Sequence, residues 1–340
     1  MATTLEEIAK HAGVSRSTVS RVMNDHPNVD HETRARVLSV AEKLNYQPNM
    51  AARSLAAGRT QVLGLAIPTG VSNLFADPYF PLLVQGITST CNARNHSVML
   101  WLGEPEYERR TIRQILQGGL IDGVILASAL MDDPILEALI KGGLPFVLIG
   151  RHPGSDPVSY IDVDNQSGAC EMVTYMLRLG YRRVATITGP INMIAGSDRY
   201  NGYLDALRDR RVPFDPALVV ESDFTEEGGY RSMQRLLPTQ PDAIFVASDA
   251  MAVGAIRALR EAGKRVPEDV AVAGFDDIPL AAHTQPSLTT VRQPIQKMGA
   301  IAAETLIDLI SHPSALPHRV VLPTELVIRA SCGSLSGGTA

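Results

Sequence analysis

The chain has 340 residues, 45% of them hydrophobic, which suits a small module followed by a larger, well-packed core. No apolar stretch approaches the ~20 residues that a membrane span needs, so the composition excludes a membrane-spanning helix. The formal net charge is −5, but residues 1–60 carry eight basic and six acidic side chains, or +2, which leaves −7 on the remainder. This modest asymmetry does not by itself indicate a nucleic-acid partner.

Residues 5–24 predict two short helices joined by a tight turn. The first helix has apolar side chains at helical spacing on one face, namely Leu5, Ile8, Ala9 and Ala12. Gly13 ends this helix, and the Ser15 hydroxyl is placed to cap the second one. The second helix buries Val19, Val22 and Met23 and leaves Arg16, Ser17, Thr18, Ser20 and Arg21 pointing outward. This pattern is typical of a helix-turn-helix that enters the DNA major groove.

Residues 31–44 predict a third helix, whose apolar face packs the three helices into one unit. The side chains of this face are Val37, Leu38, Ala41 and Leu44. Pro48 disfavours a helical conformation at Gln47 and separates this unit from the Ala-rich segment 49–58. Isolated helices this short are marginal in water, so we expect the segment to become ordered only on DNA. The alternative interpretation, a plain linker with a nascent helix, describes the same segment when no DNA is bound.

From Gln61 onward, buried apolar strands alternate with amphipathic helices, which predicts parallel sheets covered by helices on both faces. The predicted strands are residues 62–67, 98–102, 123–127, 146–149, 184–187, 244–247 and 270–275. The predicted helices are residues 106–116, 134–140, 168–179, 199–208, 226–237, 251–261 and 298–310. These units are too many for one modest sheet, so we expect two lobes with a break near residues 161–165. Periodicity alone assigns the last strands, 320–322 and 325–328, to neither lobe.

Taken together, the motifs of the chain resemble the LacI/GalR family of bacterial transcription regulators, and the resemblance covers essentially all of it. In chain order they are Thr4-Leu5, Ile8-Ala9, Gly13-Val14-Ser15, Thr18-Val19-Ser20-Arg21-Val22, Asn24, Thr33-Arg34, Val37, Leu44-Asn45-Tyr46-Gln47-Pro48-Asn49 and Ala52-Arg53-Ser54-Leu55. The resemblance implies the α/β class, with an N-terminal all-α helix-turn-helix headpiece. It also implies a two-lobed periplasmic-binding-protein-like core of parallel sheets flanked by helices.

The resemblance further implies a domain division in which three crossings link the lobes. The expected parts are a headpiece at 1–48, a hinge helix or linker at 49–60, a first lobe at 61–162 and 292–320, a second lobe at 163–291 and 321–332, and a flexible tail at 333–340. The tail is rich in Gly and Ser and has no leucine heptads, so we expect a homodimer without a tetramerising coiled coil.

Within the headpiece, the resemblance implies that the exposed face of the second helix reads an operator. Arg16 and Ser17 match the variable operator-reading pair, whereas Thr18 and Arg21 match more general contacts, and we expect Arg21 to bind a guanine. Leu55 matches the hinge leucine that opens a base step from the minor groove. Phosphate contacts are expected from Leu5, Ser15, Asn24, Thr33, Tyr46 and Asn49, and Thr4, Ser20 and Ala52 complete the predicted interface. The alternative, a solvated polar helix face, is disfavoured by the complete motif.

A second candidate site lies where the carboxyl ends of the strands face the gap between the lobes. The predicted effector contacts there are Tyr79, Phe80, Arg151, Arg199, Phe224, Ser248, Asp249 and Asp276. The resemblance is specific at Arg199, at Ser248-Asp249 and at Asp276. Family members bind small effectors at this place, mostly sugars and sometimes purines or nucleosides. Carboxylates and Arg side chains can pair with sugar hydroxyls, and aromatic rings can cover a sugar face.

Structural roles compete with effector binding at several of these positions. Asp249 is favoured as a helix N-cap, and Asp277 is assigned a structural role for the same reason. Asp276 and Arg199 are favoured as effector contacts, whereas Tyr79 and Phe80 stay open between lining the pocket and packing the lobe. The sequence departs from some family members at Gly150-Arg151-His152, where they place an acidic ligand contact, so no relative's effector specificity can be copied.

We therefore expect a cytoplasmic homodimeric transcription regulator, most simply a repressor, that binds double-stranded operator DNA with pseudo-palindromic symmetry. The effector is expected to be a mono- or disaccharide, and no cofactor is expected. Cys91, Cys170 and Cys332 lack metal-ligand spacing, which favours free thiols over a metal site.

Three other functions fit parts of the sequence. An enzyme is disfavoured because the chain lacks GxGxxG after the first strand, GxxxxGK[ST], GxSxG and HExxH. A periplasmic sugar-binding protein would need a signal peptide, which the polar start does not suggest, and would have no headpiece. A DNA-binding regulator controlled by a protein partner, without a small effector, stays open as the alternative, because no sequence feature rules it out.

Overall fold

The computed structural model describes residues 3–23, 26–46, 59–68, 71–101, 118–152, 154, 157–314 and 316–333. The chain divides into two compact units, Met1–Thr60 and Gln61–Ala340. The predicted helix 106–116, the hinge segment 49–58 and nearly all of the tail lie outside the described residues. No helix in the part of the chain that the structure describes combines the length and apolar character needed to cross a membrane.

The first unit contains the three predicted helices, α1 (Leu5–Ala12), α2 (Arg16–Met23) and α3 (His31–Lys43). Gly13 ends α1 at a φ of 65°, a left-handed conformation that glycine adopts without strain. The helices share a small core formed by Ile8, Ala9, Ala12, Val19, Val22, Val37 and Ala41. The prediction was wrong for Leu38, which is 47% exposed, because the buried face of α3 is narrower than the pattern suggested.

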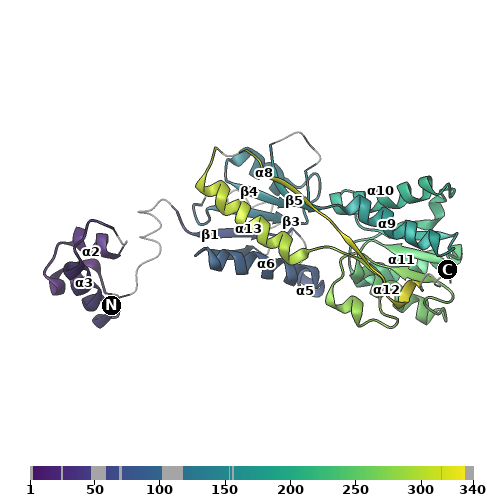
Figure 1. Cartoon of the computed structure of the whole chain (residues 1–340), viewed down its shortest axis with the longest axis horizontal. Coiled ribbons are helices and arrows are strands. Elements are labelled where there is room, and N and C mark those ends of the chain that lie inside the picture. The colour runs from purple at the N-terminus through teal and green to yellow at the C-terminus, as the bar shows by residue number, and fades with distance from the viewer. Residues whose placement is uncertain are drawn as a thin grey trace, which may run out of the picture. The chain divides into compact units, whose positions relative to one another are not determined.

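The first lobe of the second unit is a six-stranded parallel sheet with strand order β11-β5-β4-β3-β1-β2. Its strands are β1 (Val62–Ala66), β2 (Ser97–Trp101), β3 (Gly123–Ala127), β4 (Phe146–Ile149), β5 (Ser159–Val163) and β11 (Arg319–Leu322). The helices α6 (Tyr79–Ala93) and α13 (Ile295–Ser311) lie side by side on one face, and α8 (Pro134–Gly142) covers the other (Figure 1). The short helix α5 (Val71–Ala76) precedes α6.

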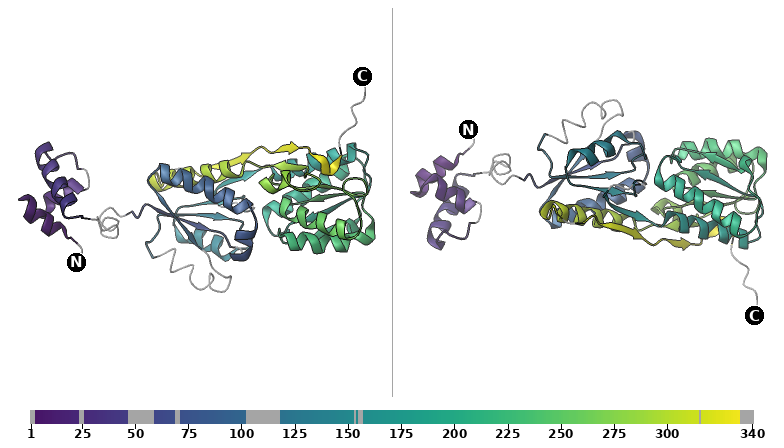
Figure 2. Two further views of the ribbon diagram at one scale, coloured as in Figure 1. Left: turned by 90° about the horizontal axis from the view of Figure 1, so that it is seen from below. Right: turned by 90° about the horizontal axis from the view of Figure 1, so that it is seen from above.

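The second lobe repeats this design with a four-stranded parallel sheet of order β7-β6-β8-β9. Its strands are β6 (Val184–Thr188), β7 (Val219–Glu221), β8 (Ala243–Val246) and β9 (Ala271–Ala273). The helices on one face are α9 (Asn165–Arg178) and α10 (Ile194–Asp209), and those on the other are α11 (Glu226–Leu236) and α12 (Asp249–Glu261). Figure 2 shows both sheets enclosed by helices, so each lobe has its own core.

The chain passes between the lobes near residues 163–165, 292–295 and 322–325, and the last two passages run through an antiparallel pair of short strands (Figures 1 and 2). These strands are β10 (Thr290–Arg292) and β12 (Glu325–Val327). The expected lobe boundary after residue 320 falls inside β11, because Val321 and Leu322 pair with Asp162 and Val163 of the first sheet. The break expected near residues 161–165 includes the end of β5, a strand that the sequence patterns did not identify.

The close packing of α6 against α13 in the first lobe can be tested by substitution at Gly86. A Cβ atom at Gly86 would lie 2.0 Å from the Gln296 carbonyl oxygen, so Gly86→Ala must push the two helices apart. We expect it to lower the free energy of unfolding by about 1–3 kcal/mol in urea titrations. Gly142→Ala is the matched control, because a Cβ atom there meets nothing within 4 Å. Equal destabilisation by the two substitutions would contradict this account of the packing.

Candidate functional site

The outer face of α2 carries the predicted DNA-reading side chains in an accessible arrangement. Arg16, Ser17 and Arg21 are exposed, and Thr18 and Ser20 are half-buried. The Ser15 hydroxyl accepts a hydrogen bond from the Thr18 backbone N–H at 3.1 Å, so it caps α2 as predicted. The Arg16 guanidinium pairs with Glu6 at 2.6 Å, but both side chains are more than 60% exposed. Because exposed ion pairs of this kind contribute little, Arg16 can leave Glu6 for another partner.

The other predicted DNA contacts within the described residues also lie on the headpiece. Thr4 accepts a hydrogen bond from the Glu7 N–H, and the Glu7 carboxylate accepts one from the Thr4 N–H, which forms a capping box at the start of α1. Leu5 and Tyr46 pack against the headpiece core, and Thr33 lies in the first turn of α3. The remaining predicted contacts lie outside the described residues, and they are Asn24, Asn49, Ala52 and Leu55.

In the second unit, a cavity of about 390 Å³ lies between the two lobes. Its volume is within the range usual for small-molecule sites. Six of the eight predicted effector residues line it, namely Tyr79, Phe80, Arg199, Phe224, Ser248 and Asp276. Arg151 and Asp249 do not belong to its lining. The expectation that ligands bind at the carboxyl ends of parallel strands thus pointed to this cavity, but it did not identify every residue of the cavity wall.

Among the described residues, Arg199 is the only cation in this lining, and the protein itself holds it in place. It lies in the second turn of α10, not at the helix start as predicted, because α10 begins at Ile194. Its guanidinium donates hydrogen bonds to the Asn165 side-chain oxygen, the Ala247 carbonyl and the Asp276 carboxylate. It also lies 3.8 Å from the centre of the Phe275 ring. These contacts fix a 5%-exposed positive charge at the cavity wall.

Asp276 faces Arg199 across a 3.3 Å ion pair and is itself buried. Its carboxylate also accepts a hydrogen bond from the Gln293 side-chain amide at 2.6 Å. The backbone of Asp276 has a φ of 123°, a conformation rare for residues with a side chain, and its N–H donates to the Val291 carbonyl at 2.7 Å. Burial raises the pKa of Asp276 to about 7, although the positive charge of Arg199 opposes this shift.

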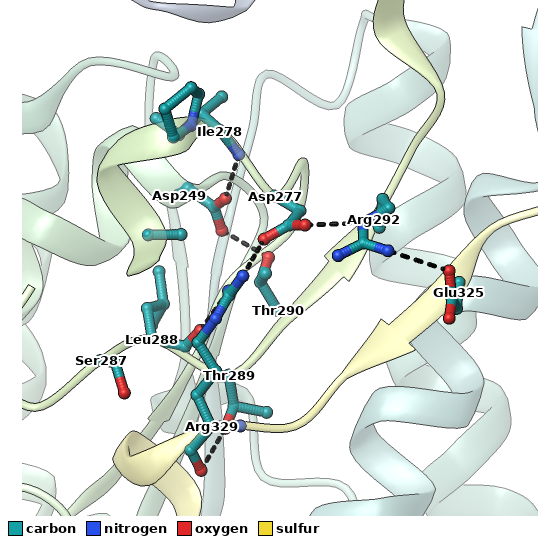
Figure 3. Close-up of polar contacts among 12 residues, drawn as sticks. Asp249, Asp277, Ile278, Ser287, Leu288, Thr289, Thr290, Arg292, Glu325 and Arg329 are labelled. Carbon is teal, nitrogen blue, oxygen red and sulfur yellow. Dashed lines mark hydrogen bonds and ion pairs between the residues drawn. The ribbon is translucent and has the colours of Figure 1, made fainter. Parts of the chain in front are cut away.

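Asp249 is not the N-cap that the sequence predicted. The Ser248 hydroxyl caps α12, and Asp249 is the first helical residue, with no solvent exposure. Its two carboxylate oxygens accept hydrogen bonds from the Thr290 hydroxyl at 2.5 Å and the Ile278 N–H at 3.0 Å (Figure 3). Burial, together with the neighbouring Asp276, raises its pKa well above the usual range. Asp249 therefore ties α12 to the crossing strand β10.

The next carboxylate in the chain, Asp277, has the structural role predicted for it, although it caps no helix. It pairs with Arg329 at 2.6 Å and with Arg292 at 2.7 Å, and Arg292 pairs further with Glu325 (Figure 3). These ion pairs connect the loop after β9 to β10 and to the segment that follows β12. Both strands of the inter-lobe crossing are thereby fixed to the loop that carries Asp276.

Arg151 lies beside the cavity but is bound by two carboxylates of the protein. Its guanidinium pairs with Asp162 at 3.1 Å in the first lobe and with Asp198 at 2.5 Å in the second.

The aromatic side chains of Tyr79 and Phe80 lie directly at the cavity. Tyr79 and Phe80 line it and also pack into the first lobe, with their rings edge to face at 5.4 Å.

Eight polar residues of the cavity wall were missed by the sequence analysis, and they are Asp77, Ser128, Asp162, Asn165, Asp223, Thr225, Glu226 and Gln293. The alternation of Ser159-Tyr160-Ile161-Asp162-Val163 was a strand signal that places Asp162 and Asn165 at a strand end. Asp77 stands two residues before α6, where the sequence analysis selected only Tyr79 and Phe80. No local pattern marks Gln293, which reaches Asp276 only through the crossing of the chain.

Two family descriptions match the chain. Residues 4–49 match "Bacterial regulatory proteins, lacI family", and residues 173–332 match "Periplasmic binding protein-like domain". The HTH-type transcriptional regulator CelR of Thermobifida fusca is 40% identical, with 96% of this chain and 98% of the relative covered. The ribose operon repressor of Escherichia coli K12 is 33% identical, with 96% and 99% covered.

Solved structures agree over the full length. A complex of the transcriptional regulator CelR with cellobiose has a TM-score of 0.77 and 38% identity, and 97% of this chain and 99% of that chain are covered. A lac repressor dimer bound to operator and the anti-inducer ONPF has a TM-score of 0.86 and 27% identity, with 98% and 100% covered. The headpiece and the two-lobed core described above are therefore the shared architecture of DNA-binding transcription regulators.

The raised pKa of Asp276 predicts how stability depends on pH. Between about pH 4 and pH 7 the folded state keeps a proton on Asp276 that the unfolded chain has lost, so this group makes stability fall as pH rises. Asp276→Asn removes the titration, and the slope of unfolding free energy against pH should become less negative by up to about 1.4 kcal/mol per pH unit. Urea titrations across this range measure the slope. The control is Asp308→Asn, which removes an exposed carboxylate. Parallel plots of unfolding free energy against pH for Asp276→Asn and the wild type would refute the prediction.

Proposed function

This chain belongs to the lacI family of bacterial regulatory proteins, and we propose that it represses transcription as a cytoplasmic homodimer whose operator affinity is set by a saccharide in the inter-lobe cavity. The observation that carries the proposal is one polypeptide with both an exposed helix-turn-helix and a cavity lined by acceptors and aromatic rings. We expect two headpieces to bind the two halves of a pseudo-palindromic operator.

The DNA-binding half of the proposal rests on α2. Its exposed face combines guanidinium and hydroxyl groups, which can bind guanine edges and phosphates in the major groove. The capped N-terminus of α1 adds backbone N–H groups of the kind that bind phosphate. The lac repressor dimer similar to this chain is bound to operator, which supports the same use of the headpiece here.

The effector half rests on the cavity. The Asp276 carboxylate and the Asn165 side chain can pair with vicinal hydroxyl groups, and Phe224 and Tyr79 can cover the apolar face of a sugar ring. The similar CelR structure is a complex with cellobiose, and another similar structure of a LacI family regulator contains ribose. A mono- or disaccharide is therefore the effector class that we propose.

Contacts from both lobes to one ligand would couple the effector to DNA. Tyr79 belongs to the first lobe and Arg199 to the second, so a saccharide that touches both favours one lobe arrangement over another. A ligand shifts such an equilibrium only through its different affinity for the two arrangements, and operator DNA is then affected reciprocally.

Arg21→Ala tests the role of α2. Loss of a guanidinium that binds a guanine edge should weaken operator binding by about 1–3 kcal/mol, or roughly 5- to 150-fold. Fluorescence anisotropy with labelled operator measures this change, and non-specific DNA gives the reference. A substitution outside the headpiece, Asp308→Asn, should leave operator affinity unchanged. Unaltered discrimination between operator and non-specific DNA in Arg21→Ala would contradict the assignment.

A thermal-shift screen against mono- and disaccharides, nucleobases and nucleosides tests the effector. A saccharide that binds only the folded state adds about 2.7 kcal/mol at a hundredfold excess over Kd, which raises the unfolding midpoint. Asp276→Asn, which keeps an oxygen that can accept from Arg199 and Gln293, should strongly reduce this shift and the effector response while the variant still binds operator. A blank screen combined with a protein partner captured on the folded regulator would replace the saccharide by that partner.

A further inference from the structure

The cavity between the lobes is strongly acidic. Five carboxyl groups line it, and they belong to Asp77, Asp162, Asp223, Glu226 and Asp276. Among the described residues of this lining, Arg199 alone carries a positive charge. Three of these carboxylates pair with a guanidinium, Asp276 with Arg199, Asp162 with Arg151 and Glu226 with Arg257, whereas Asp77 and Asp223 form no ion pair within the described residues. A ligand that enters this space therefore meets many acceptors for its hydroxyl groups and two carboxylates without a counter-ion.

The positive charge of the Arg199 guanidinium is already paired within the protein. Nη1 donates to the Ala247 carbonyl at 2.6 Å and to Asp276 at 3.3 Å, and Nε donates to Asn165 at 2.9 Å. The Phe275 ring covers one face of the group. Nη2 donates to no protein group among the described residues, so it can still hydrogen-bond a ligand, but the positive charge of the guanidinium is already balanced by Asp276. An incoming carboxylate or phosphate would therefore bring a negative charge without a cation of its own.

A second guanidinium near the cavity, that of Arg151, is committed in the same way. It follows the lining residue Gly150 and is shared between Asp162 and Asp198, whose side chains are no more than 5% exposed. The group of one cation and two carboxylates has a formal charge of −1. Arg151 therefore offers no unneutralised positive charge to an anionic ligand.

Asp77 adds a negative charge that has no cation of its own. Its carboxylate accepts a hydrogen bond from the Tyr79 N–H at 2.9 Å, and it forms no ion pair with any described Lys or Arg. It lies close enough to Asp276 for the two charges to repel each other. A further anion in the cavity would add to this repulsion, whereas the hydroxyl groups of a neutral sugar would donate hydrogen bonds to the carboxylates.

We propose that the cavity selects uncharged saccharides and rejects sugar acids and sugar phosphates, and that Asp77 is a determinant of this selectivity. The inference rests on the proposed saccharide effector and narrows its chemical class. Like charges brought together in a poorly hydrated site can cost several kcal/mol. We expect a neutral sugar to bind at least about 100-fold more tightly than an anionic sugar of matched shape.

Isothermal titration calorimetry on the full chain at pH 8 tests the proposal with matched ligand pairs. The pairs are glucose with glucuronate, glucose with glucose 6-phosphate, and cellobiose with cellobiouronic acid. The neutral member of any pair that binds should be the tighter ligand by at least about 100-fold. Equal or tighter binding of an anionic member would overturn the selectivity while leaving a saccharide effector in place. If no member of any pair binds, the proposed saccharide effector fails first, and the inference falls with it.

Two variants locate the selectivity. Asp77→Asn removes the charge but keeps an oxygen that can accept the Tyr79 N–H, so it should narrow the gap between the neutral and anionic members about tenfold. Asp308→Asn removes an exposed charge on α13 that lies outside the cavity lining, and it should leave the gap unchanged. If Asp77→Asn still binds the neutral sugar, which shows that it is folded, but the ratio of the two affinities is unchanged, Asp77 does not determine the selectivity.

Discussion

The ion pair between Arg199 and Asp276 is the interaction on which the centre of the molecule depends. Both groups are at least 94% buried, so neither charge can be left without a partner. Holding Asp276 against Arg199 requires a left-handed backbone in the loop after β9, and β10 supplies the hydrogen bond that fixes this loop. Asn165, at the start of α9, positions the guanidinium from the other side. The pair thus connects two helices, a strained loop and one crossing of the chain.

The loop that carries Asp276 both stabilises the connection between the lobes and lines the cavity. The loop that carries Asp276 is tied to the crossing strands by Asp249 and Asp277, and it also forms part of the cavity wall. A group bound in the cavity would therefore act on the segment that joins the lobes through the Asp276 loop and, directly, through Gln293, which lies in that segment and lines the cavity. Packed interiors resist continuous deformation. A ligand bound in the cavity should therefore favour one discrete arrangement of the lobes over another.

Local chemistry made part of this structure predictable. The headpiece followed from helical spacing, from Gly13 and from the Ser15 cap, all of which depend on neighbours within a few residues. The alternation of strands and helices was predicted for the same reason. The strand β5 was missed because Asp162 interrupts its apolar residues. That carboxylate is tolerated between two neighbouring strands because Arg151, Asn165 and the Val163 N–H supply its partners. A pairing between residues of different elements leaves no trace in a local pattern.

The same distinction explains which of the predicted site residues lie in the cavity wall and which do not. A charged side chain at a strand end belongs to a ligand site only if the folded protein leaves part of its bonding capacity for a ligand. Asp249 fails this condition because it is fully buried outside the cavity lining and each of its oxygens accepts a hydrogen bond from the protein. Arg151 fails it because two carboxylates share its guanidinium. Asp276 meets it, since its carboxylate reaches the cavity wall while Arg199 and Gln293 orient it. The position of a polar residue in the sequence indicates where a site lies, but only its partners in space decide whether it binds a ligand or holds the fold.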